Sequence, residues 1–582
     1  MKHKNRSIII GLVAIASLVL SACATPAPVE KVVTQLVKET VKETVIVEGT
    51  PQVVEKEVTK LVEKEVTKLV ERVVTATPVS KVGGTWTISI VEEPETLDLQ
   101  KSAMALTAAI WRYLGDPLIA KDLEGNYVPG LATSWEASED GLTWTFTLRE
   151  GVTFHDGTPL DAAAVVQTFE RALDPETNSP IAGSLLGPVE SIEVTGDMSF
   201  ALTLNEPFAP FLENLTDSGR LSALSPAAIE AAGDDIGRQP VSTGPWMFKE
   251  WVTADHITLV RNPDYNWGSE FVHQGPVYIE ELVFRVIPEP ATAMAAFEAG
   301  ELSQLSLPAS DVQRILDSRQ YEMFYYLRKG VGLFMEFNVT AAPFDDITVR
   351  KALNYAVDKQ TIVDVALEGL GEATYGPLAA SLRGYWDGID DYAPHYDPAK
   401  AAELLDEAGW VLNEGTGVRE KDGEPLSFVL YNAPIATWES AAQLIQAQLK
   451  EVGVKMDIQV FEFGTLLEKL KAGEQQAHLM GYTYATPDIV YLWFHSSNIG
   501  SGLTLSHYSN PELDQLIVDS RTVTDWPKRA EIYKDIQKMI VDEALWVPIF
   551  TQYYYIAIQS NAADANVHPD GYMILNDAYL TQ

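Results

Sequence analysis

Residues 131–173 constrain the fold of this chain most, because they carry the periods of a strand and of a helix in direct succession. Threonine alternates with tryptophan, phenylalanine and leucine over 143–148, the pattern of a strand with one polar and one apolar face. After the turn residues 155–157, apolar side chains recur every four positions from 165 to 173, and Asp161 stands where a helix N-cap is expected. We predict a strand over 143–148 and a helix that opens near Asp161.

The same stretch resembles the signature of the family 5 extracellular solute-binding proteins, the peptide, nickel and oligosaccharide receptors of bacterial ABC importers. The resemblance rests on W-x-x-S-x-D-G-x-T-x-T-F-x-L-R-x-G-V-x-F-H-D-G-x-P, which this chain carries over 135–159. Residues 240–267 resemble the family's P-x-G-T-G-P-Y-x-F and R-N-P-x-Y-W, with Ser242 in place of the usual glycine. Residues 332–369 resemble a third block, which begins F-N and continues to V-R-x-A.

The resemblance implies an α/β, two-lobed periplasmic-binding-protein-like fold of class II, with the three subdomains of family 5 and a central ligand cleft. The length of 582 residues agrees with this, since it exceeds what a single hydrophobic core supports. We expect a signal peptide at 1–22, a spacer at 23–82, lobe I at 83–116 and 239–327, a subdomain inserted into lobe I at 117–238, lobe II at 328–546, and a C-terminal return to lobe I at 547–582.

The charge balance bears on the ligand. The chain has 42 lysine and arginine residues against 82 aspartate and glutamate residues, a formal net charge of −40. A phosphate backbone is held by clustered cations, so this balance argues against nucleic acid as a partner. The excess of carboxylates serves solubility, or it favours cationic and neutral ligands over anionic ones.

The N-terminus predicts export and a lipid anchor. Basic residues precede an apolar run from Ile8 to Leu20, which is shorter than the roughly 20 residues that span a bilayer, and Leu20-Ser21-Ala22-Cys23 follows. This sequence resembles the lipobox of bacterial lipoproteins, which implies that Cys23, the only cysteine, becomes the lipidated first residue. An ordinary signal peptide is the alternative. We expect an extracytoplasmic protein tethered to the cell membrane.

Residues 24–80 differ from the rest of the chain in composition. Valine, glutamate, lysine and threonine dominate, and VEKEVTKL occurs at 54–61 and again at 62–69. Eight residues turn about 800° in a helix, so the valines do not stay on one stripe, and in a strand valine and lysine share one face. We predict a charged spacer, extended or loosely helical, that holds the globular part away from the membrane.

The ligand site is expected between the lobes, because clefts at domain junctions are preferred binding sites. In dipeptide receptors of this family an aspartate that follows a glycine by four residues pairs with the α-amino group, and here position 485 is alanine. The arginine for the peptide carboxylate is likewise absent near 432–438. Aromatic residues remain, which suit stacking on a sugar ring or an apolar group. The candidate ligand-binding residues are Glu93, Trp111, Trp438, Tyr482, Tyr484, Asp488 and Trp493.

Enzymatic function is the main alternative of a different class. The chain has no G-x-S-x-G, H-E-x-x-H, Walker or G-x-G-x-x-G motif, and its nine histidines form no i, i+4 pair. A hydrolytic Ser-His-Asp triad that includes His155-Asp156 stays an alternative. A nickel or haem receptor of the same family is a second alternative, without a dedicated ligand cluster. We predict a binding protein with no catalytic residue, metal or cofactor, whose partners are a small-molecule ligand and the permease and ATPase subunits of an importer.

The missing charged anchors lead to a testable prediction. We expect an oligosaccharide or a non-standard peptide to bind in preference to a dipeptide, because two lost charge-assisted hydrogen bonds each cost roughly 1.5–3 kcal/mol. Isothermal titration calorimetry measures this directly. Tight dipeptide binding that survives Trp438→Ala would contradict the prediction.

Overall fold

The computed structural model describes residues 34–47, 50–63 and 81–581, and the chain divides into two compact units between Pro78 and Val79. In the N-terminal unit, β1 (Thr34–Val47) and β2 (Thr50–Glu63) form an antiparallel hairpin, with register from Thr34 opposite Glu63 to Val47 opposite Thr50. The first octad copy is therefore extended and paired within its own chain, and the helical alternative is wrong for 54–63. Cys23 and the predicted signal segment lie outside the described residues.

The C-terminal unit is organised by one sheet of twelve strands. Its path runs β10-β11-β12-β3-β13-β23-β15-β22-β20-β21, and β14 and β16 also pair with β23. The strands β12, β3 and β13 are parallel, as are β22, β20 and β21, while β23 is antiparallel to its partners. The bounds are β3 Thr85–Ile90, β10 Trp246–Val252, β11 His256–Arg261, β12 Glu281–Val286, β13 Gln304–Ser306, β14 Tyr321–Leu327, β15 Val331–Phe337, β16 Gly371–Ala373, β20 Ser427–Asn432, β21 Lys455–Val460, β22 Ala477–Tyr482 and β23 Trp546–Gln559.

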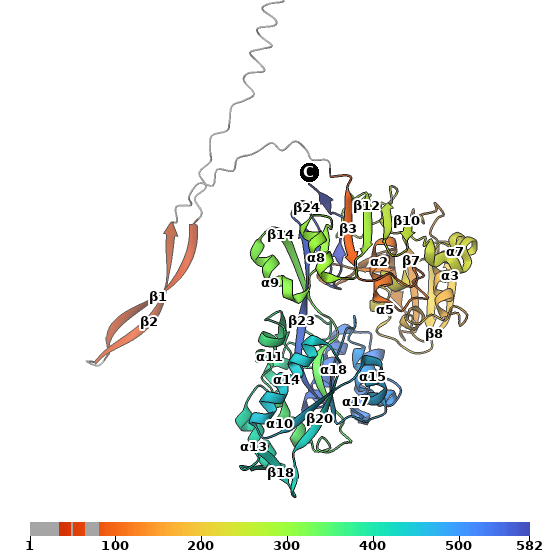
Figure 1. Cartoon of the computed structure of the whole chain (residues 1–582). Coiled ribbons are helices and arrows are strands. Elements are labelled where there is room, and N and C mark those ends of the chain that lie inside the picture. The colour runs from red at the N-terminus through yellow and green to blue at the C-terminus, as the bar shows by residue number, and fades with distance from the viewer. Residues whose placement is uncertain (1–33, 48–49, 64–80, 582) are drawn as a thin grey trace, which may run out of the picture. The chain divides into compact units, whose positions relative to one another are not determined.

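Strand β23 belongs to both lobes. Residues 546–552 pair with β15 and β16, whereas residues 553–559 pair with β14 and, near the end, with β13. Figure 1 shows β23 running from the group that contains β20 and α14 to the group that contains β3 and β14. The strand changes lobes near residue 552, a few positions after the start of the expected return at 547. The short segment between β14 and β15 makes the second crossing.

Lobe I is built from both ends of the globular body. Residues of β3 and α2 (Ala105–Leu114) share a core with β23 and with residues 562–578. Trp86, Trp111 and Ile558 are fully buried in it. A smaller core joins α8 (Pro290–Glu298) and α9 (Ala309–Ser318) to the β23 residue Ala557. The remaining short strands are β24 Ala562–Ala563, β25 Asn566–Val567, β26 Met573–Ile574 and β27 Tyr579–Leu580.

The inserted subdomain has its own core and a four-stranded antiparallel sheet in the order β6-β7-β9-β8. The predicted strand 143–148 is β7, whose even-numbered residues are buried, and Phe146 stacks on Phe200 of β9 at 5.0 Å. The predicted helix is α3 (Ala162–Leu173), capped by Asp161, which accepts from the Ala164 N–H at 2.9 Å. The other elements are β4 Ile119–Lys121, β5 Tyr127–Pro129, β6 Ala132–Ala137, β8 Val189–Gly196, β9 Ser199–Leu204, α4 Ala182–Leu185, α5 Phe211–Asn214, α6 Ser218–Leu221, α7 Pro226–Ala232 and the 3₁₀ turn η2 Gly233–Arg238.

Asp116 explains why the two motifs in 240–267 occur together. Its Oδ1 accepts from the Tyr265 hydroxyl at 2.8 Å, and its Oδ2 accepts from Thr243 Oγ1 at 2.9 Å and Trp267 Nε1 at 3.1 Å. Burial raises the pKa of Asp116 to about 6, although these hydrogen bonds act in the opposite direction. One carboxylate therefore ties both motifs to the end of α2.

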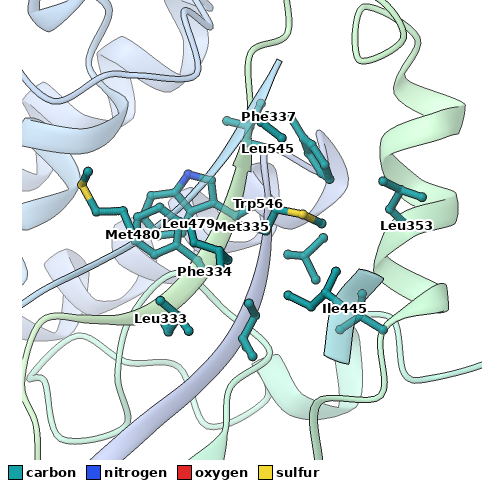
Figure 2. Packing of buried hydrophobic residues seen from close by; sticks show 14 of the residues in the cluster. Leu333, Phe334, Met335, Phe337, Leu353, Ile445, Leu479, Met480, Leu545 and Trp546 are labelled. Carbon is teal, nitrogen blue, oxygen red and sulfur yellow. The ribbon is translucent and has the colours of Figure 1, made fainter. Parts of the chain in front are cut away.

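Lobe II packs helices on both sides of β15, β22, β20 and β21. Phe334 and Trp546 stack at 3.6 Å between ring centroids, which anchors the start of β23 in this core (Figure 2). The other elements are α10 Ile347–Ala356, α11 Lys359–Ala366, α12 Ile389–Tyr392, α13 Pro398–Glu407, α14 Ala436–Glu451, α15 Phe463–Lys471, α16 Ile489–Phe494, α17 Pro511–Thr522, α18 Trp526–Asp542, β17 Val411–Asn413, β18 Val418–Lys421, β19 Glu424–Pro425 and η3 Ser496–Asn498.

The Asp116 cluster predicts a stability effect. In Asp116→Asn an amide nitrogen replaces one acceptor oxygen, so at least one of the three donors loses its partner. We expect the free energy of unfolding at pH 7 to fall by about 1–3 kcal/mol, measured by urea denaturation with tryptophan fluorescence. Asp535→Asn, at an exposed position of α18, is the control. Equal unfolding curves for the two variants would contradict the role given to Asp116.

Candidate functional site

A cavity of about 340 Å³ lies between the two lobes. Lobe I and its inserted subdomain supply charged and polar side chains to one wall, and the loop after β22 supplies the other. This volume is at the lower end of the roughly 300–1,000 Å³ typical of small-molecule sites. Its lining includes Arg112, Lys121, Glu213, Asn214, Arg220, Tyr482, Tyr484, Ala485, Thr486, Asp570 and Tyr572.

The lobe II wall is aromatic. Tyr482 ends β22, has 37% of its surface exposed, and lies 6.4 Å from the Tyr484 ring. Burial raises the pKa of Tyr484 to about 12, so its hydroxyl is protonated at neutral pH and can donate a hydrogen bond. Ala485 also lines the cavity and offers no carboxylate there. The wall can stack on a planar or apolar ligand group and donate to it.

Arg112 is the one cavity-lining cation whose side chain has neither a hydrogen bond nor an ion pair among residues 81–581. It lies in the last turn of α2, and its guanidinium sits 4.9 Å above the Tyr572 ring. No hydrogen bond or ion pair holds it within that range of residues. It also lines a smaller cavity of about 80 Å³, which shares Lys121 and Tyr572 with the larger one. Arg112 is therefore available to bind a carboxylate.

The remaining two lining cations are already engaged. Arg220 donates to the backbone carbonyls of Ser102 and Met104, at 2.6 and 2.9 Å. Lys121 lies 3.1 Å from the Asp570 carboxylate, and Lys329 of the second crossing segment lies 2.5 Å from it. Burial alone would raise the pKa of Asp570, but the two lysines outweigh it and hold that pKa well below its usual value.

Glu213 supplies an acceptor that has no partner among the described residues. The side chain belongs to α5 and is 5% exposed. Its Oε1 lies 3.7 Å from Lys121 Nζ, whereas its Oε2 is buried without a hydrogen bond. An unpaired buried carboxylate oxygen costs free energy, and a ligand N–H or O–H that reaches it would recover that cost.

Of the seven predicted ligand-binding residues, only Tyr482 and Tyr484 line the cavity. Trp111 and Trp493 are fully buried, and Trp438 is 7% exposed in the lobe II core. Trp111 Nε1 donates to the Leu97 carbonyl at 2.7 Å, and Trp493 packs 6.1 Å behind Tyr482. The three tryptophans are core residues, so the ligand-contact prediction is wrong for them, and Trp438→Ala would test packing in lobe II.

The two predicted carboxylates have partners within the protein. Asp488 is buried and ion-paired with Arg521 Nε at 2.9 Å, so its cationic partner belongs to α17. Glu93 accepts from Trp251 Nε1 at 2.7 Å, and this hydrogen bond lowers the pKa of Glu93. Neither residue lines the cavity.

None of the cavity-lining residues of lobe I was among the predicted ligand-binding residues. A signal was present for Arg112, the only charged residue in the apolar helix 105–114. Successive residues of a helix point about 100° apart, so Trp111 enters the core while its neighbour Arg112 reaches the cleft. Tyr572 and Asp570 follow β25 in a short C-terminal loop that gave no separate pattern.

The structure also bears on the two alternative functions, a hydrolytic enzyme and a nickel or haem receptor. Asp156 accepts from the Ser225 hydroxyl at 2.5 Å, and His155 Nε2 lies 3.0 Å from the Gly244 carbonyl, so both hold turns of lobe I. Within the described ranges, no three histidine, cysteine, aspartate or glutamate side chains are grouped to hold a metal ion. In the same ranges, no helix has the length and apolar character to cross a membrane.

The Asp488 pair predicts a pH dependence. Burial raises the pKa of Asp488 from 3.8 to about 6, and Arg521 opposes this shift. Between pH 3.8 and about 6 the folded protein therefore keeps the Asp488 carboxyl protonated, whereas the unfolded chain loses this proton. The contribution of Asp488 to stability is thus fully present below pH 3.8 and is lost as pH rises through about 6. The unfolding free energy of the wild type minus that of Asp488→Asn should fall between pH 4 and pH 7.5. A difference that rises with pH would show that the ion pair dominates.

Comparison with known proteins places the whole globular body in one group. The family model for bacterial extracellular solute-binding proteins, family 5 (middle), matches residues 126–501. The oligopeptide-binding protein AppA of Bacillus subtilis is 28% identical over 498 residues, covering 84% of this chain and 90% of AppA. The nickel-binding periplasmic protein of Escherichia coli is 30% identical over 446 residues, covering 75% of this chain and 83% of that protein.

A solved structure gives the same result. AppA from Bacillus subtilis in complex with a nonapeptide matches with a TM-score of 0.67 at 27% identity, covering 86% of this chain and all of that one. These matches confirm the predicted fold class. The chain belongs to the family 5 bacterial extracellular solute-binding proteins, and it is the substrate-binding protein of an ABC importer that captures a small solute.

Proposed function

We propose that the solute is a short peptide or peptide-like molecule with a free amino group and a free carboxylate. Two groups on one cavity wall support this: the Arg112 guanidinium, which has no hydrogen bond or ion pair among residues 81–581, and Glu213 Oε2, which is buried without a hydrogen bond although Oε1 of the same carboxylate lies 3.7 Å from Lys121. Charge-assisted hydrogen bonds to both ends of a zwitterion would replace the two anchors that are missing from lobe II. The cavity tyrosines then contact the middle of the ligand.

The names of relatives support the class. AppA is an oligopeptide-binding protein, and another relative, 28% identical over 515 residues, is the glutathione-binding protein GsiB of Pectobacterium atrosepticum. Glutathione is itself a peptide-like zwitterion. An oligosaccharide is the second candidate, favoured by the three tyrosines of the cavity, Tyr482, Tyr484 and Tyr572.

Paired ligands and variants test the assignment of the two ends. Calorimetry compares tripeptides and glutathione with their N-acetylated and C-amidated forms. Glu213→Gln should weaken binding of the free-amine form by about tenfold or more, since a hydrogen bond to a charged group contributes roughly 1.5–3 kcal/mol. The same variant should leave binding of the N-acetylated form unchanged. Arg112→Gln should likewise weaken binding of the free-carboxylate form and leave binding of the C-amidated form unchanged. Wild-type protein that binds oligosaccharides and none of the peptides would overturn the proposal.

We further propose that the mature chain begins at Cys23 and is held at the membrane by its acyl chains. The support is the L-S-A-C sequence after a short apolar run, together with membership of an extracellular family. One acyl chain gives only marginal binding and more than one makes it stable, because each buried CH₂ contributes about 0.8 kcal/mol.

Detergent partitioning tests the anchor. Wild-type protein expressed in a bacterium should enter the Triton X-114 phase, and mass spectrometry should find Cys23 acylated at the mature N-terminus. Cys23→Ser should move the protein to the aqueous phase. Recovery of the wild type in the aqueous phase, cleaved beside an unmodified Cys23, would instead indicate an ordinary signal peptide.

A further inference from the structure

A second contact joins the lobes away from the crossing strands. The loop between β9 and α5 meets the corner between α17 and α18. The Ala209 N–H donates to the Arg521 carbonyl at 2.6 Å, and Arg529 Nη1 donates to the Ala209 carbonyl at 3.1 Å. The Phe208 ring lies 5.4 Å from the Arg521 guanidinium. Lobe II therefore binds both backbone polar groups of one residue of the inserted subdomain.

This contact is connected directly to the cavity on the lobe I side. Helix α5 begins at Phe211, two residues after Ala209, and carries Glu213 and Asn214 into the cavity wall. Phe211 is fully buried in the subdomain core, and Asn214 Nδ2 donates to the Leu185 carbonyl at 2.8 Å. The loop and the helix are thus one short rigid segment, so the position of Ala209 sets the position of Glu213.

On the lobe II side of this contact, both arginines are held in place by other residues of lobe II. Arg529 is 4% exposed and also donates to the Ser520 carbonyl at 2.7 Å and to the Tyr533 hydroxyl at 3.0 Å. Arg521 pairs with Asp488, which follows the cavity residue Thr486 by two positions. Arginines that are already ordered lose little conformational entropy when they bind a second surface.

An arginine of lobe II reinforces the contact nearby. The Arg383 guanidinium lies 4.0 Å from the Trp526 ring centroid of α18 and 5.0 Å from the Tyr127 ring centroid of the inserted subdomain. It therefore stands between aromatic rings of both lobes. Cation–π contacts of this kind contribute roughly 0.5–2 kcal/mol, depending on burial.

We propose that Arg529 is a positioning residue for the ligand site: it latches the inserted subdomain to lobe II through Ala209, favours the closed arrangement of the lobes, and sets Glu213 opposite Tyr482 and Tyr484. The proposal rests on the peptide-binding function for its affinity readout, and its closure readout is independent of that function. Loss of the latch lowers the fraction of molecules that are competent to bind, and the apparent affinity falls by the same factor.

The chain offers a closely matched control for Arg529. Arg350 is also 4% exposed in lobe II and also donates to two backbone carbonyls, those of Phe344 and Glu543, but both lie within lobe II. Arg529→Gln and Arg350→Gln therefore remove similar buried hydrogen bonds from the same lobe. Only the first of the two variants removes a bond between the lobes.

Fluorescence energy transfer measures closure without a ligand. In a Cys23→Ser chain, dyes are placed at Val194→Cys of the inserted subdomain and Val411→Cys of lobe II, where the native side chains are 50% and 64% exposed. Arg529→Gln should shift the transfer distribution relative to its parent towards longer distances, and Arg529→Lys should restore part of it. Arg350→Gln should leave it unchanged. Equal behaviour of Arg529→Gln and Arg350→Gln would overturn the latch.

Affinity gives the second readout, with glutathione and tri-alanine as probes. Arg529→Gln should bind the probe that the wild type binds about tenfold more weakly, and Arg350→Gln should bind it within about twofold of the wild type. If Arg529→Gln does not fold, Arg383→Gln replaces it, with Lys421→Gln as control, because Lys421 lies over Trp410 within lobe II. Failure of the wild type to bind either probe would count against these ligands, and the energy-transfer result would still decide the latch.

Discussion

The fold depends on a single strand being fixed at both of its ends. Trp546 stacks on Phe334 in the lobe II core, and Ile556 and Ile558 are buried in the lobe I core. Neither end of β23 can move against its own lobe without opening a packed core, at a cost of several kcal/mol. Relative motion of the lobes must therefore be absorbed near residue 552 and in the short second crossing between β14 and β15. This is the geometry of hinge closure around a ligand.

The second crossing also brings the hinge into contact with the site. Gly330 has a φ of 104°, and a Cβ at this position would lie 2.3 Å from the Tyr482 carbonyl oxygen, so a larger residue would push the cavity strand away. Its neighbour Lys329 reaches Asp570, which lines the cavity. A ligand between the walls thus touches groups that are attached directly to the hinge. Differential contact of this kind is what lets a ligand shift a conformational equilibrium.

Local sequence signals predicted the elements well, and the site less well. Alternation over 143–148, the Asp161 cap and the period of α3 gave the inserted subdomain correctly, because each signal depends only on near neighbours. The partnership of Asp116 with residues some 130 and 150 positions away was not foreseeable, since its three donors converge only in the folded protein. Large aromatic residues misled the site prediction for a related reason. Trp438 and Trp493 suit stacking on a ligand, yet their size also makes them preferred core residues. In the folded protein both are buried in the lobe II core.

The central claim is that this clamp holds a zwitterion across one wall of an interlobe cavity. A crystal structure of the protein with the solute that copurifies from its host, identified by mass spectrometry, tests it most directly. We expect density between the lobes with a carboxylate at Arg112 and an amine within hydrogen-bond distance of Glu213 Oε2. Density for an uncharged ligand that leaves both groups unpaired, or a solute bound outside this cavity, would contradict it.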